Sequence, residues 1–455
     1  MDSCGSYEPA KALTLRVMFS PSTIDALGSQ LGAGVAEGYR VARADVPVDP
    51  LSLVRSGAHL FPFAAYFGRP DLDEAGGLGV AWRSDRVDGN SRFSDLAQQL
   101  ESCRIDERAF TGFSYLPEGG LGSEWDGFGP AASVIPIISV IGTPDSSELV
   151  VVLPPGRMWA PLADVLARLV APGRPATGRT TDLSIESRPA PTDWEGSVAN
   201  AVDSIKAKTL EKVVMARSVL VTSDVPYRPF DLVSRLRLTY PECYVFGWQE
   251  GGSVFVGASP ELLVERRGDQ VRSHPLAGSA PRGSNEDEDR AFGELLMASG
   301  KDRREHRFVV DDITARLESM TTDLHVDQSP SLRKTAHVQH LSTEVNGTLT
   351  KPTHVIDLAG RLHPTPAVGG SPRDEASRFL AKEEVIDRGW YAGAVGWANR
   401  QGDGELAISL RCALIRGRTA HLYAGAGIVG DSVPAAELEE TRLKFRTMMS
   451  LLAEA

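Results

Sequence analysis

Short runs of β-branched and aromatic residues, separated by turn residues, recur along most of this chain. In the first 170 residues they include Leu78–Arg83, Phe110–Tyr115, Val134–Ile141 and Glu148–Leu153. Such runs are typical of β-strands. Strands that follow one another through short turns pair in antiparallel order, because a parallel pair needs a long crossover connection. The pattern therefore predicts antiparallel sheets.

The rest of the chain repeats the strand pattern and adds helices. Strands are predicted over 212–222, 254–258, 262–266, 271–275, 405–415 and 420–424. Helices are predicted around 194–205, over 287–320 and over 434–452, where apolar residues recur at helical spacing or capping residues precede the segment. Hairpins interspersed with helices favour an α+β architecture, with antiparallel β-sheets packed in the middle and helices outside.

A stretch rich in proline and glycine divides the chain. Residues 171–178 read APGRPATG and are followed by further polar residues. This composition is typical of a linker. We expect an N-terminal β-rich subdomain over residues 1–170, a linker over 171–192 and a C-terminal region over 193–455, fused with the N-terminal part into one large domain.

Charge and composition narrow the class of protein. The 455 residues include 60 Asp and Glu against 48 Lys and Arg, a net charge of −12, which argues against a general nucleic-acid-binding protein. No apolar stretch is long enough to span a bilayer, and the first residues do not resemble a secretory signal. The four cysteines are scattered, without a CxxC pair, as in proteins of a reducing compartment. We expect a cytoplasmic protein.

Two pairs of carboxylates occur at helical spacing. Asp302 and Glu305 are three residues apart in one predicted helix, and Glu437 and Glu440 are three apart in another. Residues at this spacing share a helix face, so two facing helices could form an all-oxygen site, which suits Mg²⁺. The alternative is two solvated helix faces held by salt bridges, because basic residues such as Lys301 lie beside the carboxylates.

Two further ionisable residues stand in apolar surroundings. Lys212 begins an otherwise apolar strand, where it could serve as a base or simply reach solvent from the strand end. Glu261 follows the break at Ser259-Pro260. There it could be held in an apolar pocket and act as an acid, or it could be an ordinary glutamate at a strand edge.

An anion could be bound near the end of the chain. Arg411 interrupts a predicted strand of alternating apolar residues, and an arginine can hold a carboxylate through two hydrogen bonds. Gly425-Ala426-Gly427 offers backbone N–H groups, and Lys444 adds a cation. Residues 425–430, GAGIVG, also fit the dinucleotide-binding pattern GxGxxG, but only 25 residues follow, too few for the second strand of a βαβ unit.

Seven short motifs follow one another along the C-terminal region. They are KVVMAR at 212–217, GASPE at 257–261, PLAGSA at 275–280, KDRREH at 301–306, HPTPA at 363–367, AGAGIV at 424–429 and ELEET at 437–441. In sequence and in order these motifs resemble those of the chorismate-utilizing enzymes. The resemblance is strong over residues 194–455 and weaker over 110–117 and 125–136. It implies the fold of that family.

Within the family, the motifs are most similar to those of isochorismate synthases. The lysine that begins KVVMAR marks members that activate water rather than an amine. Salicylate and anthranilate synthases typically carry threonine where this chain has Ala367, and often where it has Ser279. The resemblance therefore implies an isomerase of the hydroxymutase type, which converts chorismate to isochorismate by Mg²⁺-dependent addition of water at C2 with loss of the C4 hydroxyl.

Three alternatives stay open at this point. The first is a salicylate synthase, which forms isochorismate and then eliminates pyruvate. The second is an amine-transferring chorismate enzyme, and the third is a non-catalytic protein that keeps the fold.

The resemblance also implies a role for each matched residue. Lys212 would be the general base that deprotonates the attacking water, and Glu261 the general acid that protonates the departing hydroxyl. The implied metal site comprises Glu305, Glu440, Asp302 and Glu437. The implied substrate-binding residues are Gly278, Ser279, His340, Ala367, Tyr391, Arg411, Gly425, Gly427 and Lys444.

The expected partners follow from the same resemblance. They are the small molecule chorismate and Mg²⁺, with no nucleic acid and no membrane, and the protein would be a monomer or a weak homodimer. Because a divalent ion reverses the local charge of the carboxylates around it, the net charge of −12 does not exclude an anionic substrate. Isochorismate serves siderophore and menaquinone biosynthesis alike, and the sequence leaves the pathway open.

Overall fold

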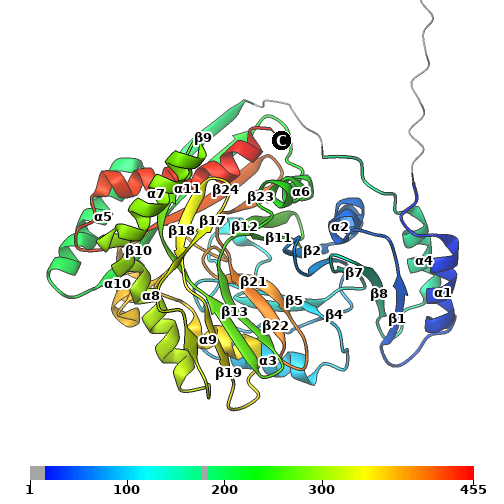
Figure 1. Cartoon of the computed structure of the whole chain (residues 1–455). Helices are drawn as coiled ribbons and strands as arrows, with labels where there is room; N and C mark the ends of the chain where they lie inside the picture. Colours follow the sequence, from blue (N-terminus) through cyan, green and yellow to red (C-terminus); the bar gives the residue numbers. More distant parts are fainter. Residues whose placement is uncertain (1–15, 176–181, 455) are drawn as a thin grey trace, which may run out of the picture.

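A computed structural model describes residues 16–175 and 182–454 of the chain (Figure 1). Within these residues the strands pair in three antiparallel sheets, which lie in the middle of the molecule with the helices outside. The α+β class expected from the sequence is confirmed.

The largest sheet has twelve strands. Its order is β1 (Arg40–Asp45), β8 (Ser147–Leu153), β7 (Ile138–Gly142), β3 (Glu74–Leu78), β2 (Phe63–Gly68), β11 (Tyr244–Glu250), β12 (Ser253–Ser259), β23 (Cys412–Arg416), β24 (Thr419–Ile428), β10 (Lys212–Ser223) and β20 (Gly370–Ser371). The twelfth strand, β9 (Leu183–Arg188), pairs with β10.

Two smaller sheets complete the strand layers. The nine-stranded sheet runs β16 (His325–Val326), β19 (Val345–Thr348), β14 (Gln270–His274), β13 (Leu262–Arg267), β22 (Gly404–Ile408), β21 (Ala394–Ala398), β5 (Ala109–Phe113), β6 (Ala131–Ile135) and β4 (Trp82–Arg83). The three-stranded sheet runs β15 (Leu276–Pro281), β18 (Val338–Ser342) and β17 (Ser331–Lys334).

Helices surround these sheets. They are α1 (Pro21–Leu31), α2 (Pro50–Gly57), α3 (Arg92–Ser102), α4 (Trp159–Arg168), α5 (Pro191–Lys206), α6 (Pro229–Thr239), α7 (Glu286–Ala298), α8 (Gly300–Glu318), α9 (Val355–Leu362), α10 (Arg373–Glu383) and α11 (Pro434–Leu452). The long helix predicted over 287–320 is thus two helices. The Oγ of Ser299 accepts a hydrogen bond from the N–H of Asp302 and so caps α8.

The twelve-stranded sheet is buried on both faces. Along β2, Phe63, Ala65 and Phe67 belong to the apolar core shared with the nine-stranded sheet, whereas Ala64 and Tyr66 belong to a second core beneath the outer helices. Because successive side chains of a strand point to opposite faces, this sheet is the middle layer of the molecule.

The N-terminal and C-terminal parts share sheets. Strand β2 pairs with β11, and β5 pairs with β21. The segment expected as a linker, residues 171–192, contains strand β9 and the first residues of α5, so its second half forms regular structure: β9 is a largely exposed strand paired with β10. Residues 1–15, 176–181 and 455, which fall within the expected boundaries, lie outside the described residues.

Two segments predicted as single strands cross between the sheets instead. Residues 134–141 split at Pro136 into β6 of the nine-stranded sheet and β7 of the twelve-stranded sheet, because proline has no N–H for the ladder. Residues 405–415 likewise split into β22 of the nine-stranded sheet and β23 of the twelve-stranded sheet, without a proline at the break. At this second break Arg411 has a φ of 48°, in the left-handed region, so the expected alternating strand through Arg411 is wrong.

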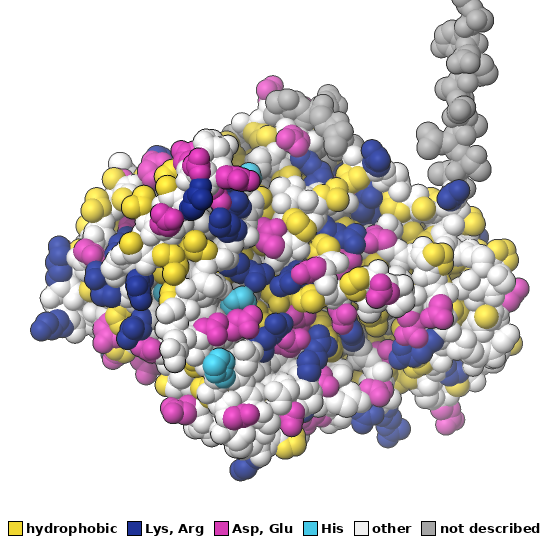
Figure 2. All heavy atoms as spheres, viewed as in Figure 1, with side chains coloured by type: hydrophobic (Ala, Val, Ile, Leu, Met, Phe, Trp, Pro, Cys, Tyr) yellow, Lys and Arg dark blue, Asp and Glu magenta, His cyan; other side chains and the backbone are white. Residues whose placement is uncertain are grey.

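The surface carries charges of both signs. On the face shown in Figure 2, acidic and basic side chains are interspersed and no basic stripe is seen. Within the described residues no helix is both long and apolar enough to cross a membrane. The cytoplasmic location and the absence of a nucleic-acid partner stay predictions.

Candidate active site

A small cavity of about 50 Å³ lies where the sheet crossings, the three-stranded sheet and helices α8 and α11 meet. Eleven of the residues predicted from the sequence line it: Glu261, Gly278, Ser279, Glu305, His340, Ala367, Arg411, Gly425, Gly427, Glu440 and Lys444. Segments nearly 200 residues apart in sequence thus meet at one point. The structure brings together the residues that the separate motifs contain.

Glu261 enters the cavity at a crossing point of the chain. Pro260 ends β12, and after Glu261 the chain continues as β13 in the other sheet. The side chain is only 3% exposed, and its Oε1 accepts a hydrogen bond of 3.3 Å from the N–H of Leu276. Burial raises the pKa of Glu261 to about 8, against the weaker opposing effects of this hydrogen bond and nearby cations. The carboxyl group therefore carries a proton at neutral pH.

Lys212 begins β10 and is completely buried. Its Nζ lies 3.1 Å from Oε1 of Glu305, yet it makes no hydrogen bond of good geometry within the described residues. Gly427, paired with Val214 on the neighbouring strand, leaves room for both side chains, since a Cβ at this position would stand 3.2 Å from Lys212 Cε. The Lys212 Nζ is thus fixed beside Glu305 and keeps hydrogen-bonding capacity for a ligand or a water molecule.

Arg411 is held by a chain of hydrogen bonds. Its Nη2 lies 3.3 Å from Nε2 of His340, and Nδ1 of His340 lies 3.1 Å from the carbonyl of Gly278 and 3.0 Å from Oγ of Ser279. Arginine only donates and a carbonyl only accepts, so Nδ1 carries the ring proton and Nε2 accepts. Burial and the neighbouring Arg411 lower the pKa of His340 to about 3, which keeps the ring neutral. His340 therefore orients the Arg411 guanidinium.

Lys444 and Tyr391 lie beside the part of β24 that contains Gly425 and Gly427. Lys444 Nζ donates to the carbonyl of Gly425 at 2.7 Å and lies 2.7 Å from Oε1 of Glu440. A Cβ on Gly425 would come within 3.0 Å of the Tyr391 hydroxyl. Tyr391 does not line the cavity, but it stands directly beside Gly425, which does. The strand carries glycine here because larger residues would push Tyr391 away.

The predicted metal-binding carboxylates surround an ammonium group. Lys301 Nζ donates to Oε1 of Glu437 at 2.6 Å, and Glu437 is buried. Burial opposes a charged lysine, but this hydrogen bond together with the charges of Glu437, Glu440 and Glu305 raises the pKa of Lys301 above its ordinary value. Three of the four predicted carboxylates therefore lie close enough to act on one cation.

The fourth carboxylate, Asp302, is placed differently. Its carboxylate accepts a hydrogen bond from the hydroxyl of Ser299, and its Cβ packs against Gly278, which has a φ of 71°. Asp302 thus joins α8 to the three-stranded sheet and does not line the cavity.

The surroundings suit a hard cation. Among the described residues no group of three or more His, Cys, Asp and Glu side chains forms a ready metal centre. The donors are nevertheless carboxylate oxygens, Glu305 and Glu440 face one cavity from two helices, and they already attract the Lys301 ammonium. The magnesium site stays a prediction.

Two groups near the cavity were not predicted from the sequence as part of the site. From the sequence, Lys301 was expected only to form salt bridges on a solvated helix face. It nevertheless stands four residues before Glu305 and so shares its helix face. The N–H of Leu276, which holds Glu261, left no signal in the side-chain pattern, because any residue except proline carries that group.

Comparisons with known proteins agree with the motif resemblance. A family model described as chorismate binding enzyme matches residues 39–453. The salicylate biosynthesis isochorismate synthase of Pseudomonas aeruginosa is 36% identical over 428 residues, which cover 90% of this chain and 88% of that protein. Isochorismate synthase MenF of Bacillus subtilis is 36% identical over 366 residues, or 78% of this chain and 76% of that protein.

A solved structure shows the same fold. The menaquinone-specific isochorismate synthase MenF from Escherichia coli matches with a TM-score of 0.81 and 29% sequence identity, covering 95% of this chain and 99% of that one.

Proposed function

The chain belongs to the chorismate-binding enzyme family, and on that premise we propose that it converts chorismate to isochorismate. The observation that carries the proposal is the pair of buried groups Glu261, which lines the cavity, and Lys212, which lies directly behind it with its Nζ 3.1 Å from the cavity-lining Glu305. Relatives named as isochorismate synthases support it.

The reaction requires one base and one acid. A hydroxyl group leaves C4 of chorismate while water adds at C2 and the ring double bond shifts between them. Hydroxide is a poor leaving group, so a proton donor must act at C4. Glu261 is protonated at neutral pH because burial raises its pKa to about 8, which suits it to this step.

Lys212 is the proposed base. Its amine takes a proton from the water that attacks C2, and Glu305 at 3.1 Å holds the resulting ammonium. In the reverse reaction Lys212 returns the proton and the carboxylate of Glu261 receives one. The two residues therefore exchange roles, as a reversible isomerisation requires.

The substrate carries two carboxylates, and the cavity offers separate cations for them. Arg411 is oriented by His340, and Lys444 by the carbonyl of Gly425. The backbone N–H groups near Gly425 and Gly427 add donors without side chains in the way. We assign these groups to binding the carboxylates.

Magnesium is part of the proposal. Glu305 and Glu440 would hold it, with Glu437 acting through a water molecule. Bound there, the ion would supply a hard positive charge for one substrate carboxylate.

The product profile tests the function. Purified protein, chorismate and Mg²⁺ are incubated, and the products are separated by chromatography. We expect isochorismate as the main product, with chorismate remaining at equilibrium. Salicylate and pyruvate as main products would replace the isomerase proposal by a lyase, and a product formed only with ammonia would replace it by an amine transferase.

A further inference from the structure

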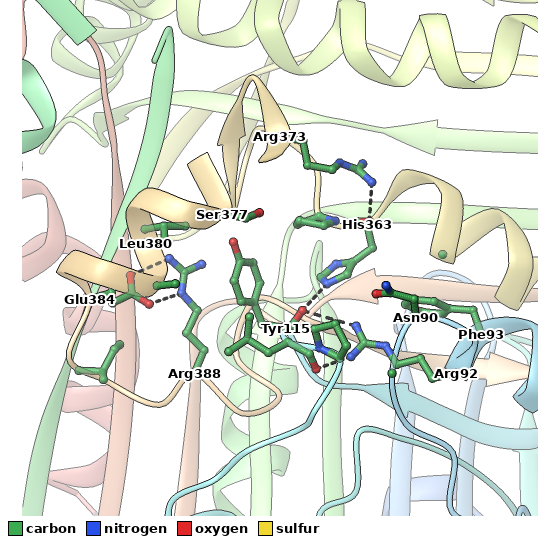
Figure 3. Close-up of a pocket in the computed structure, with 17 residues that line it drawn as sticks. Asn90, Arg92, Phe93, Tyr115, His363, Arg373, Ser377, Leu380, Glu384 and Arg388 are labelled. Carbon is green, nitrogen blue, oxygen red and sulfur yellow. Dashed lines mark hydrogen bonds and ion pairs between the residues drawn. The ribbon is translucent and has the colours of Figure 1, made fainter. Parts of the chain in front are cut away.

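A second and larger cavity, of about 570 Å³, lies apart from the candidate active site (Figure 3). Helices α3, α9 and α10 and the segment after β5 enclose it. It shares no lining residue with the smaller cavity. The loop after α9 separates the two, since His363 and Pro364 line the larger cavity and Ala367 lines the smaller one. We call it the arginine cavity, after Arg92, Arg373 and Arg388.

The three arginines differ in what balances their charge. Arg388 lies in an ion pair with Glu384, with hydrogen bonds of 2.5 and 2.7 Å. Arg92 makes no ion pair within the described residues; its Nη2 donates to the carbonyl of Ser114 at 3.1 Å. A carbonyl dipole satisfies a hydrogen bond but cancels no net charge.

Arg373 is in a similar position. Its Nη1 donates to the carbonyl of His363 at 2.9 Å and its Nη2 to that of Leu362 at 2.7 Å. The nearest carboxylate, Asp312, is 4.0 Å away and already bonds to Arg316 at 2.7 and 2.8 Å. The cavity therefore holds an excess of two positive charges, those of Arg92 and Arg373.

Burial makes this excess costly. Arg92 is 2% exposed, and burial lowers its pKa to about 10. Burial, together with the neighbouring Arg316, lowers the pKa of Arg373 to about 10 as well. A buried charge without a counter-ion is unfavourable, so an anion beside Arg92 would relieve a cost that the folded protein already carries, whereas Arg373, whose side chain is 25% exposed, carries less of it.

Three residues that line the cavity carry unpaired donors. The Nε of Arg92, the Nε of Arg373 and the hydroxyl of Tyr115 are buried and have no hydrogen-bond partner within the described residues. The Tyr115 hydroxyl points toward Ser377 in Figure 3. Buried donors are normally paired, so a group with acceptor oxygens would complete the site.

The remaining walls are apolar and partly aromatic. Phe93, Leu380 and Ile386 line the cavity, and the Arg92 guanidinium stands 4.7 Å from the centre of the Phe93 ring. A ligand that filled this space would need a flat apolar body beside its charged group.

We propose that the arginine cavity binds a small aromatic monocarboxylate, with the carboxylate facing Arg92, Arg373 and the Tyr115 hydroxyl and the ring against Phe93 and Leu380. Its volume lies within the range of ordinary small-molecule sites. Guanidinium groups match the geometry of a carboxylate. The site does not depend on the function proposed for the smaller cavity.

Calorimetric titration of the full chain with benzoate tests the proposal. We expect saturable binding, which weakens at least about tenfold for neutral benzamide and for inorganic phosphate, a loss of roughly 1.4 kcal/mol. Benzamide lacks the charge and phosphate lacks the ring. Absence of benzoate binding at millimolar concentration, or equal binding of all three, would overturn it.

Variants locate the site. Arg373→Gln should weaken benzoate binding at least about tenfold, since a charge-assisted hydrogen bond is lost. Arg378→Gln is the matched control, because Arg378 lies on the same helix but is 74% exposed and pairs with Glu375. Arg411→Gln removes a cation of the smaller cavity. Binding that depended on Arg411 and not on Arg373 would assign benzoate to the smaller cavity and overturn the proposal.

A second variant tests the proposal in case Arg373→Gln does not fold. Ala381 is exposed at the edge of the cavity on α10, so the larger side chain of Ala381→Phe would occupy part of the cavity without replacing an arginine. We expect it to abolish benzoate binding while the far-UV circular dichroism is unchanged. Unaltered binding in this variant would contradict the proposal even if Arg373→Gln failed to fold.

Discussion

The two cavities of this protein differ in how their basic side chains are balanced, although within the described residues each contains an arginine without an ion pair, Arg411 in the smaller and Arg92 in the larger. In and beside the smaller one, three lysines have carboxylate partners: Lys212 with Glu305, Lys301 with Glu437 and Lys444 with Glu440. In the arginine cavity Arg92 and Arg373 donate mainly to carbonyls, and the carboxylate nearest Arg373, that of Asp312, is 4.0 Å away and bonds to Arg316. The lysine–carboxylate pairs would hold the proposed catalytic groups in place before the substrate arrives. A guanidinium group without a close carboxylate partner is instead available to bind an anion.

Lys212→Ala should produce the largest effect on the smaller cavity. It removes the proposed base, so turnover should fall about 10⁴-fold, the upper end for a general base. Chorismate binding, followed by calorimetry, should persist because Arg411 and Lys444 remain. Lys382→Ala, at a side chain that is 81% exposed, is the control. Turnover within tenfold of the wild type, about 1.4 kcal/mol, would refute the role of Lys212.

Glu261→Gln should have the next largest effect. The amide keeps the shape of the side chain but cannot donate an acidic proton, so kcat should fall about 10³-fold. Steady-state kinetics with chorismate measure it. If only KM changed, Glu261 would bind the substrate rather than protonate it.

The pH profile of the wild type sharpens the role of Glu261. Its folded-state pKa of about 8 lies above the ordinary value of 4.5, so the acid form is present below pH 8 and disappears above it. Activity should therefore fall as the pH rises through about 8. By linkage, the contribution of Glu261 to stability is full below its ordinary pKa and is lost as the pH rises through about 8. Glu261→Gln should lack that loss of melting temperature.

Lys301→Met should have a smaller effect on turnover and should increase the response of the melting temperature to magnesium. It removes the ammonium from among three carboxylates, which then repel one another and attract a divalent ion more strongly. We expect a lower melting temperature without magnesium and a larger rise on adding it than in the wild type. Arg303→Met, at an exposed neighbour on α8, is the control. An identical magnesium response in both variants would contradict a cation site here.

Ala381→Phe should have the smallest effect on turnover. It occupies part of the arginine cavity from an exposed position, and surface substitutions usually change free energies by less than about 0.5 kcal/mol. Turnover of chorismate should therefore stay within about twofold of the wild type. A large loss would show that the two cavities work as one.

Much of the candidate site was predicted from short motifs. Glu261, Arg411 and Lys444 were each named from local sequence, and all three face one cavity. The strand over 212–222 and the last helix, Pro434–Leu452, were also predicted correctly. What local sequence did not reveal was the break of apparent strands at Pro136 and Arg411, because a strand looks the same in either sheet.

The sequence by itself indicated the candidate residues: the lysine at the head of an apolar strand, the glutamate after a proline and the paired carboxylates. The tertiary structure alone decided how strongly they act. Glu261 lies where the chain crosses from the twelve-stranded to the nine-stranded sheet. The partner of Lys301, Glu437, lies on α11, more than 130 residues away in the sequence. The arginine cavity likewise joins Arg92 of α3 to Arg373 of α10. Burial and pairing depend on contacts between distant segments, which no local pattern contains.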